Sequence, residues 1–243
     1  MRGVFFDLGG TLFSYRNVPR ATVPLLLEAV TRLGVKADKE RLKEAYAEAS
    51  RDMTLAYADQ AYYLHRDFFH GTFARFAELL DATHDAAVQD WYLEAHRVAI
   101  IDCLVLKEDC IDTLAHLKEL GLYLSVVSNI DDDMLEPLIE RENLGRYLDH
   151  WTSSEAAQSC KPDRRFFELA LARAGLAPAE VLFVGDSPEH DIIGAHALGM
   201  QTALILDGGI PPPLQTGRVQ VKPTHTIDSL SALKHIAIAA RRA

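Results

Sequence analysis

The sequence predicts an α/β protein in which a doubly wound parallel sheet carries an inserted, all-helical domain. Short apolar segments rich in β-branched and aromatic residues recur along the chain, and amphipathic helical segments lie between them. One long stretch near the start shows helical periodicity only. Strands that are covered by helices on both faces lack polar alternation, so continuous apolar runs favour a parallel sheet.

Four segments have the pattern of such buried strands: residues 4–6, 122–127, 181–184 and 202–206. Three amphipathic helices are expected beside them, over residues 109–120, 164–174 and 188–198. Each helix is followed by a glycine, the residue that most readily takes the left-handed conformation at a helix end. The alternation of strands and helices indicates a sheet whose sites lie at the carboxyl ends of its strands.

Residues 15–101 interrupt this alternation with helical periodicity over residues 21–33, 38–57, 60–80 and 84–100. We therefore expect a helical domain of bundle type over 15–101, and a core domain formed by 1–14 and 102–243. Asp38 is the expected N-cap of the second helix. The aromatic residues of this domain are expected to pack in its interior. The glycine- and proline-rich segment 207–223 predicts an irregular surface loop.

Composition narrows the class of protein. The 243 residues fit one large domain or a core with a smaller domain attached, and nearly half are hydrophobic. A net charge of −10 argues against nucleic acid or an anionic membrane as partner. A strand-like segment begins at Gly3, and no apolar run approaches the roughly 18 residues of a membrane span. Three scattered cysteines indicate neither disulfides nor zinc. We expect a soluble cytoplasmic protein that acts on a small molecule.

Four short stretches hold the side chains that carry chemistry. They are Asp7 with Gly9-Gly10-Thr11, then Ser128-Asn129, then Lys161-Pro162, and last Gly185-Asp186-Ser187 with Asp191. Pro162 is expected in the first turn of the following helix. In a parallel sheet these stretches should converge on one crevice.

The residue types suggest covalent catalysis. A carboxylate such as Asp7 can attack phosphorus or carbon and divide one difficult step into two. Two further carboxylates would repel it unless a hard cation such as Mg²⁺ neutralised them. Lys161 would keep Asp7 ionised and stabilise the transferring group, and Ser128 and Thr11 could donate hydrogen bonds to it. Taken singly, each residue also fits a structural role, as a cap, a solvated lysine or a first-turn acid.

Together the stretches resemble a known family. D-x-x-G-T at 7–11, the apolar strand ending in Ser128-Asn129, Lys161-Pro162, and G-D-x-x-x-x-D at 185–191 resemble the four motifs of the haloacid dehalogenase superfamily, in order. The helical insertion between the first two motifs is similar to the C1 cap of subfamily I, which closes over the site. The resemblance covers residues 1–13 and about 105–206.

The resemblance implies a role for each matched residue. Asp7 would be the nucleophile and a Mg²⁺ ligand, and Lys161 would stabilise both the nucleophile and the transition state. Asp186, Asp191 and the backbone carbonyl of Gly9 would complete the metal site. The substrate would be a small phosphorylated metabolite, and its phosphate would contact a set of five residues: Gly10, Thr11, Ser128, Asn129 and Lys161.

Gly9 departs from the family pattern. Family phosphatases carry an aspartate there, which protonates the leaving group and then activates water. Glycine can do neither, and such general acid–base help is typically worth about 10²–10⁴ in rate. A histidine of the helical domain, His65 or His70, could replace the acid, although a packed or surface histidine is the more common case.

Three functions stay open on the sequence. The first is an active phosphatase with reduced turnover of simple esters. The second is a dehalogenase-like enzyme that attacks carbon, with Arg32 or Arg41 holding a carboxylate substrate. The acidic pair Asp186 and Asp191 counts against this second function, because a metal has no role in that chemistry. The third is a phosphate-binding scaffold that has lost turnover with the acid.

Overall fold

A six-stranded, all-parallel sheet forms the centre of the core in the computed structural model, which describes residues 1–83, 85–206, 208, 212, 214–217 and 221–242. The strand order is β5-β4-β1-β6-β7-β8. The bounds are β1 Gly3–Phe6, β4 Tyr123–Ser128, β5 His150–Ser153, β6 Val181–Gly185, β7 Gln201–Ile205 and β8 His225–Ile227. The predicted fold class is therefore confirmed.

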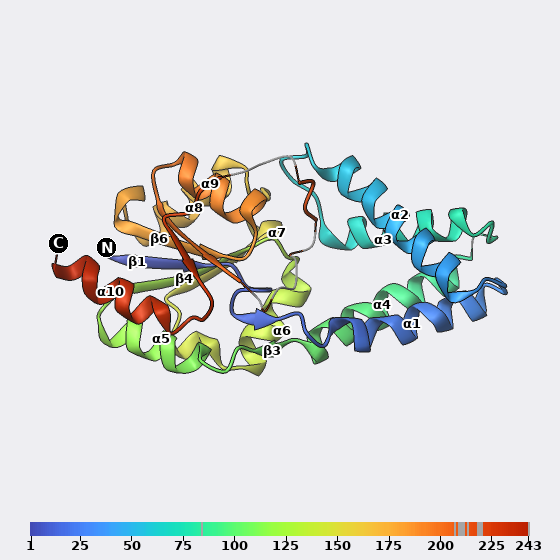
Figure 1. Ribbon diagram of the computed structural model, residues 1–243, viewed down its shortest axis with the longest axis horizontal. Helices are drawn as coiled ribbons and strands as arrows, with labels where there is room; N and C mark the ends of the chain where they lie inside the picture. Colours follow the sequence, from blue (N-terminus) through green and yellow to red (C-terminus); the bar gives the residue numbers. More distant parts are fainter. Residues whose placement is uncertain (84, 207, 209–211, 213, 218–220, 243) are drawn as a thin grey trace. The chain divides into compact units, whose positions relative to one another are not determined.

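Helices cover both faces of this sheet. In Figure 1, α8 (Arg164–Ala174) and α9 (Ile193–Ala197) lie on one face, and α5 (Cys110–Glu119) and α6 (Asp132–Arg141) lie on the other. The last helix, α10 (Ala232–Arg242), packs against α5. Burial on both faces explains the unbroken apolar runs, as where Phe183 of β6 meets Phe167 of α8 with ring centroids 5.2 Å apart.

The four predicted strands are all present, but β5 and β8 were missed. Both are short edge strands whose sequences, His-Trp-Thr-Ser and His-Thr-Ile, lack an apolar run. The glycines expected at helix ends, Gly121, Gly175 and Gly199, all have positive φ. The predicted loop over 207–223 lies in part outside the described residues, as does His84 at the start of a predicted helix.

Two helix predictions need correction. Pro162 does not lie in the first turn of α8, because Asp163 is the N-cap and accepts a hydrogen bond from the Arg165 amide at 2.9 Å. The helix expected over 188–198 is divided into a π-helical turn, η3 (Pro188–Ile192), followed by α9. In that turn the Ser187 side chain accepts a hydrogen bond from the His190 amide and caps the segment.

A short two-stranded ribbon marks where the chain leaves and re-enters the core. β2 (Phe13–Ser14) pairs antiparallel with β3 (Val105–Leu106). The structure divides into two compact units, one of residues 1–15 and 105–243 and the other of residues 16–104. These limits differ by a few residues from the predicted 15–101, since the last inserted helix runs on to Cys103.

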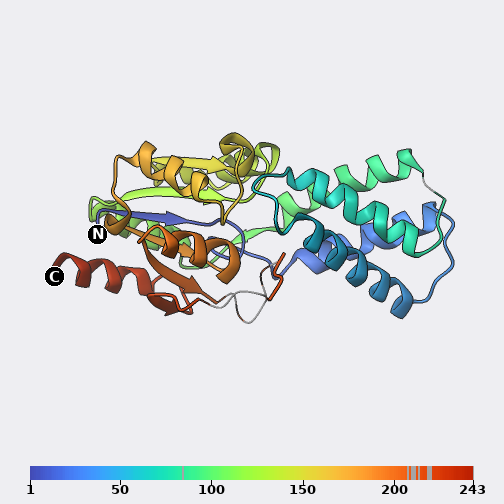
Figure 2. The same ribbon diagram turned by 90° about the horizontal axis from the view of Figure 1, so that it is seen from above.

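The inserted unit consists of four helices: α1 (Val18–Arg32), α2 (Lys39–Tyr57), α3 (His65–Leu79) and α4 (Ala86–Cys103). Figure 2 shows them side by side, with α1 against α4 and α2 against α3. Some of its aromatic side chains pack in the interior, as Phe73 and Tyr92 do with ring centroids 4.4 Å apart, whereas others such as Tyr62 and Tyr63 are only partly buried. Asp38 caps α2 as predicted, accepting from the Arg41 amide at 2.9 Å.

The basic side chains considered as substrate ligands have partners within this unit. Arg32 pairs with Glu28 at 2.5 Å, and its guanidinium lies 3.5 Å from the ring centroid of Trp91. Arg41 donates to the carbonyl of Leu79. His65 is buried in α3, whereas His70 is exposed.

Among the described residues, every helix is too short or too polar to cross a membrane.

Burial of His96 makes the helical unit sensitive to acid. His96 is 7% exposed, between the rings of Phe69 and Tyr92, and this burial lowers its pKa to about 4. The unfolded chain, with an ordinary pKa near 6.5, binds a proton that the folded chain rejects. The stabilisation is therefore complete above about pH 6.5 and is lost as the pH falls toward 4.

We expect the free energy of unfolding to fall by about 2 kcal/mol more in the wild type than in His96→Phe between pH 7 and pH 5. Denaturant titrations of both proteins at the two pH values measure this difference. His190, whose pKa burial also lowers to about 4, is present in both and cancels. Equal losses in the two proteins would show that His96 does not carry the acid sensitivity.

Candidate active site

The parallel register brings the sequence-predicted residues to one edge of the sheet. Phe6, the last residue of β1, pairs with Val126 of β4 on one side and Val184 of β6 on the other. Asp7 follows immediately, and its amide donates to the carbonyl of Val184 at 2.9 Å. The polar residues that end β4 and follow β6 therefore flank Asp7.

The Lys161 ammonium joins two carboxylates at this edge. Its Nζ donates to Asp7 Oδ1 at 2.7 Å and to Asp191 Oδ1 at 2.6 Å, and the residue is only 3% exposed. Burial alone would lower the pKa of this amine, but the charges of Asp191 and Asp7 outweigh burial and raise it. Lys161 therefore stays protonated inside the protein.

Two neighbouring residues orient the Lys161–Asp7 pair. The side-chain Nδ2 of Asn129 donates to the backbone carbonyl of Lys161 at 2.9 Å, and its Oδ1 accepts from the backbone N–H of Lys161 at 2.7 Å. Ser128 Oγ donates to Asp7 Oδ1 at 2.9 Å, so a hydroxyl and an ammonium converge on one oxygen. Asn129 thus positions Lys161 through its backbone, a role that the sequence did not indicate.

Asp7, Asp186 and Asp191 form a buried acidic cluster, with one oxygen from each within 4.8 Å of the others. Asp191 Oδ2 accepts from the Ser187 amide at 3.0 Å, but within the described residues Asp186 Oδ2 is buried without a hydrogen bond. Burial, together with the charges of Asp7 and Asp191, raises the pKa of Asp186 well above its ordinary value. Burial likewise raises the pKa of Asp191 to about 6, against the opposing effect of Lys161.

The charge and donor set of this cluster fit a hard divalent cation. Among the described residues, Lys161 is the cation that forms ion pairs within this group of three carboxylates, which leaves an excess of two negative charges in the group when all four residues are ionised. The buried, unpaired Asp186 Oδ2 is an oxygen that a cation would satisfy. Mg²⁺ prefers such oxygen ligands and needs few of them from the protein. Asp7, Asp186 and Asp191 are therefore suited to hold it.

Two glycines allow the carboxylates to approach the backbone this closely. Gly10 has φ +71°, and a Cβ there would lie 1.9 Å from Asp186 Oδ2. A Cβ on Gly185 would lie 2.2 Å from Asp191 Oδ2. Any larger residue at either position would push a carboxylate out of the cluster.

Tyr15 is a residue of the site that sequence reasoning missed. The chain turns back after Gly9, which forms a β-bridge with Phe13, and a Cβ on Gly9 would lie 2.2 Å from Tyr15 Oη. Nothing in the spacing between Asp7 and Tyr15 signals this return. The resemblance drew attention to what Gly9 lacks, but only the structure shows which side chain lies over it.

The structure thus brings five predicted residues together: Asp7, Ser128, Lys161, Asp186 and Asp191. Thr11 Oγ1 is buried and, among the described residues, has no hydrogen-bond partner. The expected contacts of Gly10, Thr11 and Asn129 with substrate, and of the Gly9 carbonyl with metal, stay predictions.

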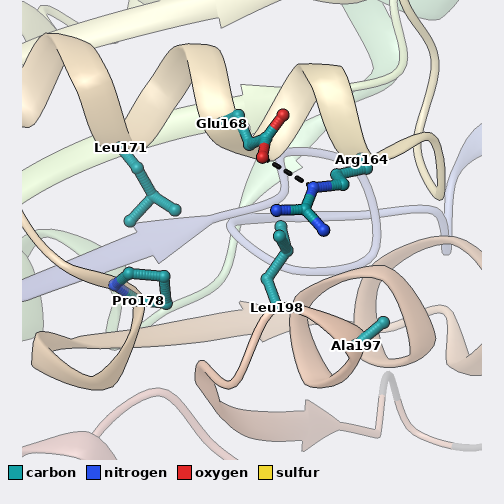
Figure 3. A pocket seen from close by; sticks show the side chains of 6 residues that line it. All are labelled: Arg164, Glu168, Leu171, Pro178, Ala197 and Leu198. Carbon is teal, nitrogen blue, oxygen red and sulfur yellow. Dashed lines mark hydrogen bonds and ion pairs between the residues drawn. The ribbon is translucent and has the colours of Figure 1, made fainter.

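A hollow of 360 Å³ lies elsewhere on the core unit, beside α8 and α9. Figure 3 shows its lining, in which Arg164 Nε donates to Glu168 Oε1 at 2.6 Å and Leu198 projects into the same space. None of the residues of the acidic cluster lines it. It is separate from the candidate active site.

Comparison with known families decides the classification. Residues 1–199 match the model of the haloacid dehalogenase-like hydrolases. The chain belongs to this family. It is a hydrolase of the superfamily with the helical insertion of subfamily I, as the motifs at Asp7, Ser128, Lys161 and Asp186 indicated.

Two full-length relatives of this hydrolase have different activities. It is 29% identical to the ribulose-1,5-bisphosphate 5-phosphatase of Halopiger xanaduensis over 237 residues, 95% of this chain and 96% of the relative. It is also 29% identical to (S)-2-haloacid dehalogenase 4A of Burkholderia cepacia over 240 residues, 96% of this chain and 93% of the relative. Overall identity therefore does not separate phosphatase from dehalogenase.

Solved structures show the same fold. A dehalogenase matches with a TM-score of 0.68 and 25% identity, covering 97% of this chain and 96% of that one. The magnesium-bound hydrolase YfnB of Bacillus subtilis matches with a TM-score of 0.73 and 18% identity, covering 97% and 98%. The core and the inserted helices are thus shared along nearly the whole length.

The acidic cluster predicts opposite effects of one substitution on stability and on Mg²⁺ binding. Asp186→Asn removes a carboxylate that burial and its neighbours disfavour, so the metal-free variant should be more stable. We expect a rise in Tm of roughly 2–4 °C for each kcal/mol gained. Calorimetric titration should show Mg²⁺ affinity falling about tenfold or more, since a ligand is lost.

Asp90→Asn is the matched control, because Asp90 is exposed in the helical unit and its loss removes the same charge. This control should leave both Tm and Mg²⁺ affinity near the wild-type values. Unchanged Mg²⁺ affinity in Asp186→Asn would remove the metal assignment.

Proposed function

We propose that this hydrolase is a Mg²⁺-dependent phosphatase that acts on a small phosphorylated metabolite with Asp7 as nucleophile. The buried cluster of Asp7, Asp186 and Asp191 carries the proposal. Three carboxylates around one ammonium cost stability unless a cation joins them, and such a cation suits phosphoryl transfer.

The residues around Asp7 have complementary tasks in this proposal. The Asp7 carboxylate attacks phosphorus and forms a phosphoaspartate, while Lys161 and Ser128 hold its Oδ1 and fix the direction of attack. The Thr11 hydroxyl, buried without a partner among the described residues, is suited to donate to a phosphoryl oxygen. Orientation of this kind contributes much of the rate in phosphoryl transfer, because the protein does little covalent chemistry there.

Asp7, Asp186, Asp191 and the Gly9 carbonyl would hold the Mg²⁺. When bound, Mg²⁺ supplies charge neutralisation for the phosphoryl oxygens and for the carboxylates around them. Lys161 supplies positive charge from the chain itself.

Dehalogenation is the second candidate, and Gly9 favours it. Attack on carbon expels a halide that needs no proton, so loss of an acid at position 9 would do no harm. The dehalogenase of Burkholderia cepacia matches this chain along its length. Displacement of a halide from carbon needs no metal, however, so a cluster of three carboxylates suited to Mg²⁺ favours the phosphatase.

The ribulose-1,5-bisphosphate 5-phosphatase of Halopiger xanaduensis gives independent support. Its substrate is a small sugar phosphate, and the match extends over nearly all of both chains. We infer the same chemical class, a phosphorylated metabolite, without assigning the sugar.

A phosphate-binding scaffold without turnover is the outcome left if neither phosphatase nor dehalogenase activity is found.

Release of phosphate and of halide tests this proposal directly. A panel of phosphate esters, acyl phosphates and 2-haloacids should give phosphate release that requires Mg²⁺, with acyl and aryl phosphates the best substrates. Asp7→Asn, which has the same shape but is not nucleophilic, should lower the rate by at least about 10³-fold. Halide release that is independent of Mg²⁺, without phosphate release, would establish the dehalogenase instead.

We also propose that residues 16–104 act as a lid that closes over the substrate. The motivation is the order of elements along the chain, in which this compact helical unit is inserted directly after the motif that contains Asp7. Closure excludes water from the reacting groups.

Hydrogen exchange with Mg²⁺ and aluminium fluoride, a phosphoryl mimic, should show slower exchange in parts of residues 16–104 as well as around Asp7. Asp7→Asn, which weakens binding of the mimic, should show neither change. Protection confined to the core unit would contradict the lid.

A further inference from the structure

The Tyr15 side chain occupies the space that opens over Gly9. A Cβ on Gly9 would meet Tyr15 Oη at 2.2 Å, and a Cβ on Gly10 would meet Tyr15 Cε2 at 3.0 Å. The ring therefore lies on the backbone of these two glycines, next to the turn that follows Asp7. Tyr15 is half-buried, so part of the side chain faces solvent and could meet a substrate. All of these residues belong to the core unit.

The ribbon of β2 and β3 holds this arrangement in place. Tyr15 directly follows Phe13–Ser14, which pairs with Val105–Leu106, and Phe13 is also bridged to Gly9. The amides of Leu12 and Phe13 both donate to the carbonyl of Leu8, which closes the turn. The hydroxyl is therefore placed by a hydrogen-bonded turn and not by a free loop.

Cleavage of a phosphate ester needs a proton for the departing oxygen. Two donors beside Asp7 serve its carboxylate, since Lys161 Nζ bonds to Asp7 and Asp191, and Ser128 Oγ bonds to Asp7. A phenol carries its proton at neutral pH and can both donate and accept a hydrogen bond. Tyr15 is thus a hydroxyl of suitable chemistry above the turn of the nucleophile.

We propose that Tyr15 is a catalytic residue that transfers its hydroxyl proton to the leaving-group oxygen, an inference that rests on the proposed phosphatase function. As the Asp7 oxygen forms its bond to phosphorus, the bond from phosphorus to the ester oxygen breaks. That oxygen takes the Tyr15 proton and leaves as an alcohol. Water then attacks the phosphoaspartate and returns a proton to Tyr15, which releases phosphate and restores Asp7.

Tyr15→Phe tests this role, because it keeps the ring on Gly9 and Gly10 and removes only the hydroxyl. Phosphoenzyme formation from an alkyl phosphate should slow by about 10²-fold or more, the usual range for a lost general acid. Formation from acetyl phosphate, whose leaving group needs no proton, should stay within about twofold. Decay of the phosphoenzyme should slow equally for both substrates. Rapid quench and intact-protein mass spectrometry measure formation and decay separately.

Tyr147→Phe is the matched control, since Tyr147 is a half-buried tyrosine of the same unit and loses the same hydroxyl. It should leave both steps unchanged for every substrate.

A second pair of variants tests the position of Tyr15 over Gly9 without relying on Tyr15→Phe. Gly9→Asp alone should gain nothing, because its Cβ would meet Tyr15 Oη at 2.2 Å. Tyr15→Ala opens this space. The double variant Tyr15→Ala with Gly9→Asp should therefore turn over alkyl phosphates at least about tenfold faster than Tyr15→Ala alone. The effects of the two substitutions would then be strongly non-additive.

Each outcome has a definite meaning. Formation rates in Tyr15→Phe that equal those of the wild type for all leaving groups would overturn the role of Tyr15 and leave the phosphatase standing. An equal loss for alkyl and acetyl phosphate would also overturn it, since only a packing role acts without regard to the leaving group. A wild type that forms no phosphoenzyme and hydrolyses no phosphate would refute the proposed function itself, and this inference with it.

Discussion

The buried ammonium of Lys161 is the interaction on which the rest of the site depends. It bonds to Asp7 after β1 and to Asp191 in η3, so it ties together two segments that are more than 180 residues apart in the chain. Removal of one partner from such a buried pair typically costs about 3–5 kcal/mol, because a charge is left uncompensated. Asn129 holds the backbone of Lys161 through two hydrogen bonds. The pair still leaves Asp186 Oδ2 buried without a hydrogen bond among the described residues, and this unsatisfied oxygen makes the cluster receptive to a cation.

Much of the fold could be predicted from the sequence, because burial on both faces leaves a plain pattern. The four central strands are marked in the sequence by apolar runs. The helices between them are followed by glycines, which have positive φ in the structure. The edge strands β5 and β8 could not be predicted in this way, since an edge strand needs no continuous apolar run. The π-helical turn at Pro188–Ile192 was also missed, because the sequence there has ordinary helical periodicity.

The residues of the site could be predicted where a side chain lies at the end of a strand. They could not be predicted where tertiary contacts determine the position of the side chain. Asp7 and Asp186 directly follow strands and Ser128 is the last residue of one, so their meeting at one edge follows from parallel pairing. The role of Asn129 toward the Lys161 backbone depends on two loops packing together. Tyr15 depends on the turn that brings the chain back over Gly9, and single-residue patterns do not encode such a return. The substrate is decided by side chains that no motif specifies.

The central claim is that Asp7 attacks phosphorus, and locating the covalent intermediate tests it most directly. Wild-type protein mixed with acetyl phosphate and Mg²⁺, then quenched in acid during turnover, should yield a phosphorylated peptide. Fragmentation of that peptide should place the phosphoryl group on Asp7. Phosphate release at full rate with Asp7 unmodified throughout, or with the phosphoryl group on another residue, would contradict the account.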